Sequence, residues 1–201
     1  MALAARYLES VVEGLELCPY ARPARRAGRV RMERVGTRHG AGHCAARVAA
    51  LAQDAATEVI LLVFDLEAGD PRHEARAFEA FLREFQSLHH AGSSAAFYSV
   101  MFHPRIEERV PRTTPDSLVQ VIRRAPMPMI QCLRASVMDA VRAQAQSGAR
   151  ERLAAGAPSG QWALTDPVLS RAVAQANFAR YGDGAGRRAL EERLRALEKP
   201  Q

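Results

Sequence analysis

The length and composition of the chain are those of an ordinary globular protein. It has 201 residues, of which 48% are hydrophobic and 25% charged, and these fractions exclude a mainly disordered chain. A globule of this size buries roughly 70% of its unfolded surface, so it can fold without disulfides or a structural metal. We therefore expect a single domain over residues 1–201.

The net charge of +6 raises the question of a nucleic-acid partner. The 28 basic residues, however, are mixed with 22 acidic ones, and only 6% of the residues are aromatic. A protein that binds nucleic-acid strands would show clustered Lys and Arg with aromatic stacking platforms. We expect no nucleic-acid partner and, instead, a small anionic substrate. Whether the chain forms a homo-oligomer is left open.

Cysteine usage and hydropathy indicate a cytoplasmic protein with no membrane partner. The three cysteines are widely spaced: Cys18, Cys44 and Cys132. An odd, scattered set forms no disulfide framework, which favours free thiols in a reducing compartment. Charged residues interrupt the apolar N-terminus, unlike a signal peptide. The longest apolar run, residues 59–64, is far shorter than the ~20 residues needed to cross a bilayer.

Helical and extended patterns alternate along the first part of the chain. Apolar residues at helical spacing from Leu3 to Leu15 predict an amphipathic helix. It should end near Cys18, because Pro19 disfavours helical geometry in the residue before it. The next predicted elements are a strand at 29–35, a helix at 41–56 and a strand at 58–65 that is buried on both faces.

The same alternation continues to the C-terminus. A strong helix carries apolar residues from Phe78 to Leu88 and ends before Gly92. The further predictions are a buried strand at 95–102, a helix at 116–123, an extended segment at 126–131, a helix starting near 136, a loop at 148–160, a helix from 165 with Gly182 past its end, and a final helix through 190–197. Strands alternating with helices predict an α/β fold: a single-domain, partly parallel sheet flanked by helices.

His103 is well placed for chemistry because it follows a buried strand. In α/β sheets, ligands bind outside the carboxyl ends of the strands, and Pro104 holds the backbone of His103 out of helical geometry. The imidazole could act as a metal or haem ligand or as a general base. It could equally be a polar tip that hydrogen-bonds the loop.

Cys18 is the second candidate. A cysteine at the C-terminus of a helix lacks the field that stabilises a thiolate, although nearby Arg22, Arg25 and Arg26 could offset this. A Cys-Pro pair presents sulfur on a rigid turn, a geometry compatible with an axial haem bond. The alternative is a small buried hydrophobe that closes the helix.

Three spaced motifs carry a resemblance to a known family. They are GLELCPYA at 14–21, FHP at 102–104 and RRAPMPMIQCLRASV at 123–137. Together they resemble the small bacterial proteins catalogued as domain of unknown function 1415, and Asn177 matches more loosely. The family pattern has histidine and glutamate where this chain has Gln131 and Ala135. Roles at those two positions are therefore not carried over, and we expect a variant of the family's chemistry.

The third motif adds two arginines to the candidate site. Guanidinium groups suit carboxylates and phosphates, including haem propionates. The resemblance favours Arg124 as the residue that holds a propionate or a substrate carboxylate, with Arg134 as a second cofactor-binding residue. The remaining loop arginines are predicted to form a plain polar face.

The segment HGAGHC holds three potential metal ligands: His39, His43 and Cys44. No acidic residue completes a recognisable zinc pattern, and the two glycines favour a loop with incidental histidines.

Three hypotheses about function follow. The first is a haem-dependent oxidoreductase, oxygenase or peroxidase-like, that acts on a small organic substrate, with His103 or Cys18 as the axial ligand. The second is a metal-free transferase or hydrolase in which His103 is the base for a Cys18 nucleophile, which requires hydrogen-bond reach between them. The third is a non-catalytic small-ligand or protein-binding module. The sequence lacks phosphate-loop, dinucleotide and nucleophile-elbow motifs, which disfavours ATP- and NAD-dependent chemistry.

Overall fold

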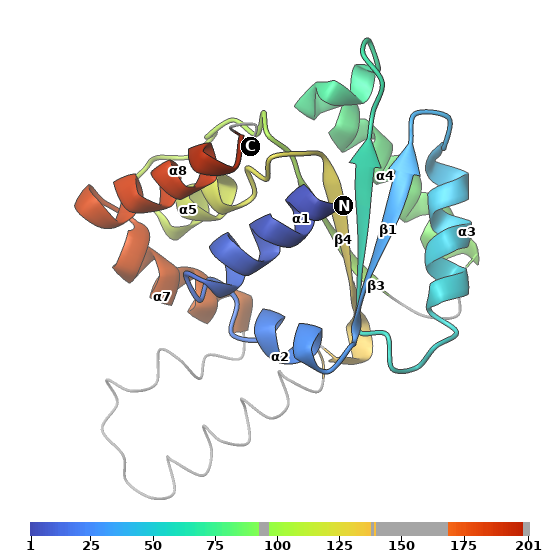
Figure 1. Cartoon of the computed structure of the whole chain (residues 1–201), viewed down its shortest axis with the longest axis horizontal. Helices are drawn as coiled ribbons and strands as arrows, with labels where there is room; N and C mark the ends of the chain where they lie inside the picture. The colour runs from blue at the N-terminus through green and yellow to red at the C-terminus, as the bar shows by residue number, and fades with distance from the viewer. Residues whose placement is uncertain (93–96, 138, 140–168, 199–201) are drawn as a thin grey trace, which may run out of the picture.

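The protein folds as a mixed four-stranded sheet between two helical layers, which confirms the predicted α/β class (Figure 1). The computed structural model describes residues 1–92, 97–137, 139 and 169–198. The predicted loop at 148–160 and the helix start near 165 lie outside the described residues. The strands are β1 (Val30–Gly36), β2 (Val59–Asp65), β3 (Phe97–Phe102) and β4 (Met129–Arg134).

The strand directions distinguish the two ends of the sheet. The order is β1-β2-β4-β3, with β1 parallel to β2 and with β4 antiparallel to both β2 and β3. It follows that β1, β2 and β3 point the same way. We call the end at which these three strands finish the carboxyl end of the sheet, and the opposite one the amino end.

Two helices cover one face of the sheet and most of the others cover the opposite face (Figure 1). The first layer consists of α3 (Ala41–Leu51) and α4 (Ala75–Gly92). The second consists of α1 (Ala2–Tyr7) with its π-helical continuation η1 (Leu8–Glu13), α5 (Pro115–Ile122), α7 (Leu169–Tyr181) and α8 (Gly184–Glu198). The short helix α2 (Ala21–Arg26) lies at the amino end. Among the described residues, no helix has the length and apolar character needed to span a membrane.

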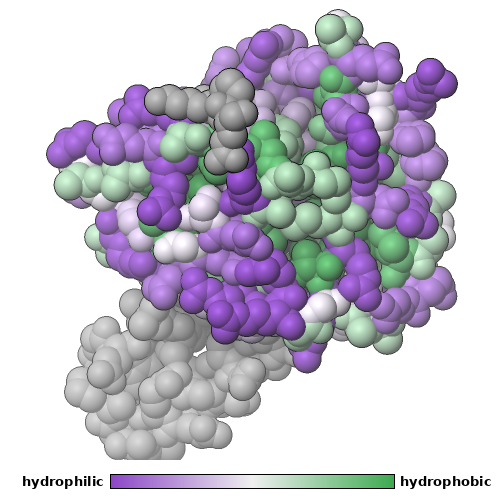
Figure 2. Space-filling model, viewed as in Figure 1, coloured by the Kyte–Doolittle hydropathy of each residue, from purple (hydrophilic) through white to green (hydrophobic). Residues whose placement is uncertain are grey.

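Alternation along the central strands divides the core in two. Ile60, Leu62 and Phe64 of β2 pack toward α3 and α4, and Leu61 and Val63 pack toward the second layer. All five are buried, as predicted for a strand covered on both faces. Figure 2 shows hydrophilic side chains over most of the visible face, with apolar residues gathered between the two layers.

Three local predictions differ from the structure. The strand β3 is not fully buried: it lies at the lateral edge of the sheet, and Tyr98 is 48% exposed. An apolar run in the sequence cannot distinguish a central strand from an edge strand, because the position of a strand in the sheet depends on the strand order. His43 and Cys44 lie in the first turn of α3, after the N-cap Gly40, within the predicted helix at 41–56 and not in the loop expected for HGAGHC. The helix α2 was not predicted, since six residues are too few to show helical periodicity.

A buried arginine, Arg72, ties the loops together at the carboxyl end. It belongs to the short 3-10 helix η2 (Pro71–His73) that precedes α4. Its guanidinium binds both carboxylate oxygens of Asp70, at 3.0 and 2.7 Å, and lies over the rings of Phe64 and Phe81. It also donates to the carbonyls of Thr37 and His39, in the loop that follows β1. One side chain therefore fixes the loops after β1 and after β2 to each other.

Replacing Arg72 should destabilise the fold far more than replacing an exposed arginine with an equally good ion pair. We expect Arg72→Met to lower the free energy of unfolding by about 3–5 kcal/mol, because it leaves the buried carboxylate of Asp70 without its charged partner and two loop carbonyls without a donor. Arg47→Met, which removes a half-exposed pair with Glu33, should cost at most about 1 kcal/mol. Urea denaturation measures both; equal losses would contradict the structural role assigned to Arg72.

Candidate functional site

The structure divides the predicted site residues between the two ends of the sheet. His103 follows β3 and Arg124 precedes β4, so both lie at the carboxyl end. Their segments are in contact, because the backbone N–H of His103 donates to the carbonyl of Arg123 at 2.9 Å. Arg134 closes β4 at the amino end. Cys18 also belongs to the amino end, because it immediately precedes α2, which leads into the start of β1 (Figure 1).

The separation of Cys18 and His103 bears directly on the hypothesis of a Cys–His pair. Strands of six or seven residues make the sheet about 20 Å long at ~3.3 Å per residue. A nucleophile and its base must approach within hydrogen-bond reach. Residues at opposite ends of the sheet do not meet this requirement, so the geometry gives no support to His103 as the base for Cys18.

His103 is completely buried, and both of its ring nitrogens are in use. Nδ1 accepts the backbone N–H of Arg105 at 3.1 Å, and Nε2 lies 3.1 Å from the carbonyl oxygen of Arg72. An amide can only donate and a carbonyl can only accept, so the ring is the neutral Nε2–H tautomer. Burial lowers the pKa of His103 below its ordinary value. The imidazole acts here as the hydrogen-bonded polar tip that the sequence left open as an alternative, and it joins the loop after β3 to Arg72.

Arg134 has a similar internal role at the other end. Its guanidinium donates to the carbonyls of Thr57, Ala52 and Asp54 at 2.8–3.0 Å, and it lies over the ring of Phe97. Ala52 is the C-cap of α3, where the last carbonyls of a helix have no partner within the helix. Arg134 therefore closes the connection between α3 and β2, and this internal role engages its Nε and Nη2.

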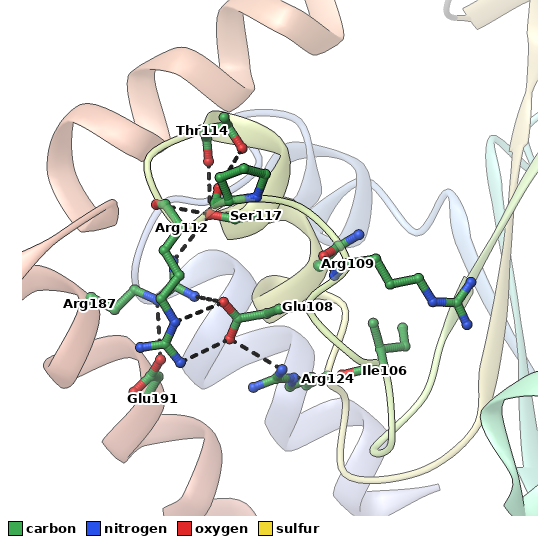
Figure 3. A network of polar contacts seen from close by, with 11 residues as sticks. Ile106, Glu108, Arg109, Arg112, Thr114, Ser117, Arg124, Arg187 and Glu191 are labelled. Carbon is green, nitrogen blue, oxygen red and sulfur yellow. Dashed lines mark hydrogen bonds and ion pairs between the residues drawn. The ribbon is translucent and has the colours of Figure 1, made fainter.

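Arg124 is engaged in a network around one carboxylate (Figure 3). Its Nε donates to the carbonyl of Ile106 at 2.8 Å, and Nη2 lies 3.3 Å from Glu108. The same carboxylate meets Arg112 from the loop before α5 and Arg187 from α8. The prediction that Arg124 binds a carboxylate finds a counterpart here, but the carboxylate belongs to the protein.

Cys18 is the one cysteine of the three that is not fully buried. Its side chain is partly exposed, whereas Cys44 and Cys132 are fully buried. Burial raises the pKa of Cys18, and hydrogen bonds from the backbone N–H groups of Tyr20 and Ala21 offset part of this effect. The sequence placed Cys18 at the C-terminus of a helix, where the field opposes a thiolate. Because α2 was not predicted, the donors at its amino end were missed.

The backbone around Cys18 is held in an unusual conformation. Glu16 has φ 54°, and no other non-glycine residue in the described part of the chain has a positive φ. Asn177 of α7, itself buried, donates from Nδ2 to the carbonyl of Leu17 at 2.8 Å. Buried Glu13 forms a bidentate pair with Arg25 at 2.6 and 2.9 Å. Asn177, which the sequence matched only loosely, is thus part of the Cys18 turn.

Comparison with known proteins assigns the family and no activity. The model of the family described as "Protein of unknown function (DUF1415)" matches residues 2–152. The chain belongs to the DUF1415 family. No curated protein and no solved structure matches it.

The structure gives a physical account of the DUF1415 motifs in this chain. His103, Arg124 and Arg134 all bond main-chain groups in other segments, so they hold loops in place. Gln131, where the family pattern has histidine, lies in mid-strand opposite Leu61, which faces the second helical layer. This position therefore faces the layer that carries Cys18. Sequence spacing alone could not show this, because it depends on the register of β4.

An open cavity of about 530 Å³ lies at the carboxyl end, outside β1 and β2. Its walls mix both charges, including the ion pair of Arg34 with Asp65. Within the described ranges, no group of three or more His, Cys, Asp or Glu side chains is arranged to hold a metal ion. The stacked rings of His39 and His43, with centroids 4.0 Å apart, fit packing against each other better than chelation.

The buried neutral imidazole of His103 should make the protein less stable in mild acid. The pKa of His103 is lowered in the folded state, so the unfolded chain takes up a proton first, and stability is lost as the pH falls below the ordinary value of 6.5. We expect the free energy of unfolding to fall by at most about 1.4 kcal/mol per pH unit below that point. Urea denaturation between pH 7.5 and 5.5 measures this. His103→Gln should be less stable at pH 7.5 with a flatter slope; an unchanged slope would contradict the assignment.

Alkylation should distinguish Cys18 from the other two thiols. Iodoacetamide should modify Cys18 at least about 100-fold faster than Cys44 or Cys132, because a buried thiol reacts only when the structure opens. The raised pKa of Cys18 means that its rate should still climb about tenfold per unit from pH 7 to 9. Peptide mass spectrometry follows each site, with Cys18→Ala as the baseline. A plateau below pH 8 would show that the pKa is not raised.

Proposed function

We propose that the protein is a haem-dependent oxidoreductase that acts on a small anionic molecule and uses the Cys18 sulfur as the axial ligand. The observation that carries the proposal is the setting of this sulfur. It is partly exposed, precedes the rigid Pro19, and accepts two backbone N–H groups. Hydrogen bonds to a ligating thiolate tune the potential of the iron that it binds. The chain's free thiols also fit a reducing compartment, and we propose the cytoplasm.

The raised pKa of Cys18 favours a metal-bound thiolate over a free nucleophile. A free thiol with this pKa is mostly protonated near neutral pH and needs a base, and His103 is at the other end of the sheet. A metal cation lowers the pKa of a thiol that coordinates it, so the thiol loses its proton to solvent and needs no base from the protein. The same geometry therefore supports the haem hypothesis more than the metal-free transferase or hydrolase.

The residues that would accompany the haem differ from those predicted. Both ring nitrogens of His103 are occupied within the protein, and Nε and Nη2 of Arg124 and of Arg134 are engaged there too. Arg26, exposed on α2 just after Cys18, would hold a propionate or a substrate carboxylate, whereas Arg22 on the same helix already donates to the carbonyl of Glu13 at 2.8 Å. Bound haem would supply one-electron and oxygen chemistry. The chain would supply the thiolate, its two N–H donors and this anion binding.

A second candidate is a non-catalytic module that binds a small ligand or a protein. The internal roles of His103, Arg124 and Arg134 favour it, since motif residues that fix loops need no reaction to explain them. In that case Cys18 and its donors also serve the turn before α2.

Haem titration separates the two candidates. We expect the protein, purified without a metal-affinity tag, to develop a Soret band when ferric haem is added, and Cys18→Ala to lose it. His43→Ala serves as the matched control, because it removes an exposed imidazole and should leave the spectrum unchanged. The change at Cys18 should leave the free energy of unfolding within about 1 kcal/mol of the parent. A parent protein without a Soret band, or a band retained in Cys18→Ala, would overturn the haem proposal.

A further inference from the structure

The carboxylate of Glu108 lies in an arginine cradle, which we define as Arg112, Arg124 and Arg187 (Figure 3). Arg187 Nη2 lies 2.8 Å from Oε2, and Arg124 Nη2 lies 3.3 Å from Oε1. Arg112 approaches both oxygens, at 3.2 and 3.3 Å. The Glu108 side chain is only 12% exposed. Three guanidinium groups from three separate segments thus converge on one buried carboxylate.

This arrangement carries more positive charge than one carboxylate can balance. The three arginines bring three positive charges against one from Glu108. Glu191, 3.1 Å from Arg187, adds a second negative charge and still leaves an excess. The buried hydroxyl of Ser117 lies beside the cradle and accepts from Arg187 Nη1 at 3.4 Å. Planar guanidinium groups that converge on oxygen atoms are the chemistry that recognises phosphate as well as carboxylate.

Arg187 is held by the core, whereas Glu108 and Arg112 both lie in the segment between β3 and α5. Arg187 lies in α8, whose Leu190 and Leu194 are buried in the core, and its own side chain is 7% exposed. Arg124 is fixed through the carbonyl of Ile106. Glu108 belongs to the segment between β3 and α5, which has no regular structure. Three side chains bond the backbone of this segment: Arg124 at the carbonyl of Ile106, Gln120 at the N–H of Arg109, and Ser117 at the carbonyl of Arg112.

We propose that the arginine cradle is a binding site for a small phosphate-type dianion, and that Glu108 is a built-in competitor that occupies it in the unliganded protein. A dianion would balance the charge of the cradle better than one carboxylate does. Binding would expel the Glu108 side chain and loosen the backbone next to it, at Arg109. The site lies apart from Cys18 in the chain and does not depend on the proposed haem chemistry.

Removing the competitor tests the proposal directly. We expect Glu108→Ala to bind inorganic phosphate at least about tenfold more tightly than the parent in calorimetric titrations at constant ionic strength, since the cradle is then unoccupied. Glu107→Ala is the matched control, because it removes an exposed glutamate one residue away and should bind phosphate like the parent. Adding Arg124→Ala to Glu108→Ala should abolish the gain. Equal phosphate affinity in Glu108→Ala and Glu107→Ala would overturn the proposal.

A measurement on the parent protein tests the same idea if Glu108→Ala fails to fold. Saturating phosphate should expel Glu108 and speed hydrogen exchange of the Arg109 amide by several-fold, while amides in β2 keep their protection. Exchange at Arg109 that phosphate leaves unchanged would show that Glu108 is a permanent structural ion pair and not a competitor.

Discussion

The buried guanidinium of Arg72 is the interaction on which the carboxyl end of the sheet depends. It pairs with Asp70, donates to two carbonyls after β1, and lies over Phe64 and Phe81. Its own carbonyl bonds His103. A buried charge is stable only when its pair and all of its donors are satisfied, so these loops have essentially one arrangement compatible with the core. The position and tautomer of His103 follow from Arg72.

The motif residues that were predicted to bind a cofactor or a substrate act largely as hydrogen-bond partners for main-chain groups of the protein. Loops that cross the end of a sheet leave carbonyls without partners, and an unpaired buried carbonyl is costly. Arg124 and Arg134 supply several donors at fixed angles, which satisfies such carbonyls with one side chain each. Part of the arginine and histidine content of the motifs therefore serves to hold the loops of this fold in place.

Two places carry more polar structure than loop closure requires. At the amino end, the turn at Glu16 has a left-handed backbone, is held by Asn177, and presents the Cys18 sulfur to two N–H donors. Such strain persists only where surrounding contacts fix it, and it is commonest at functional sites. At the carboxyl end, three guanidinium groups surround Glu108. The two proposals rest on different chemistry, a soft sulfur at the amino end and a cluster of guanidinium groups at the carboxyl end.

The sequence by itself determined the local structure and the family. Hydrophobic periodicity located β1, β2, α4 and α5 to within a few residues, because these elements are long or regular enough to show their period. It also identified two candidate site residues: Cys18, which precedes a proline after the first helix, and His103, which follows a strand. It did not reveal α2, which is too short, nor the exposure of β3, which depends on strand order.

Only the tertiary structure decided what the candidate residues do. Strand order and direction place Cys18 and His103 at opposite ends of the sheet, and they bring Arg187, 79 residues away in the chain, onto Glu108. Each of His103, Arg124 and Arg134 bonds at least one main-chain group of another segment, and such groups have no sequence signature. Sequence shows which side chains can carry out chemistry, whereas the fold decides which of their atoms remain free to do so.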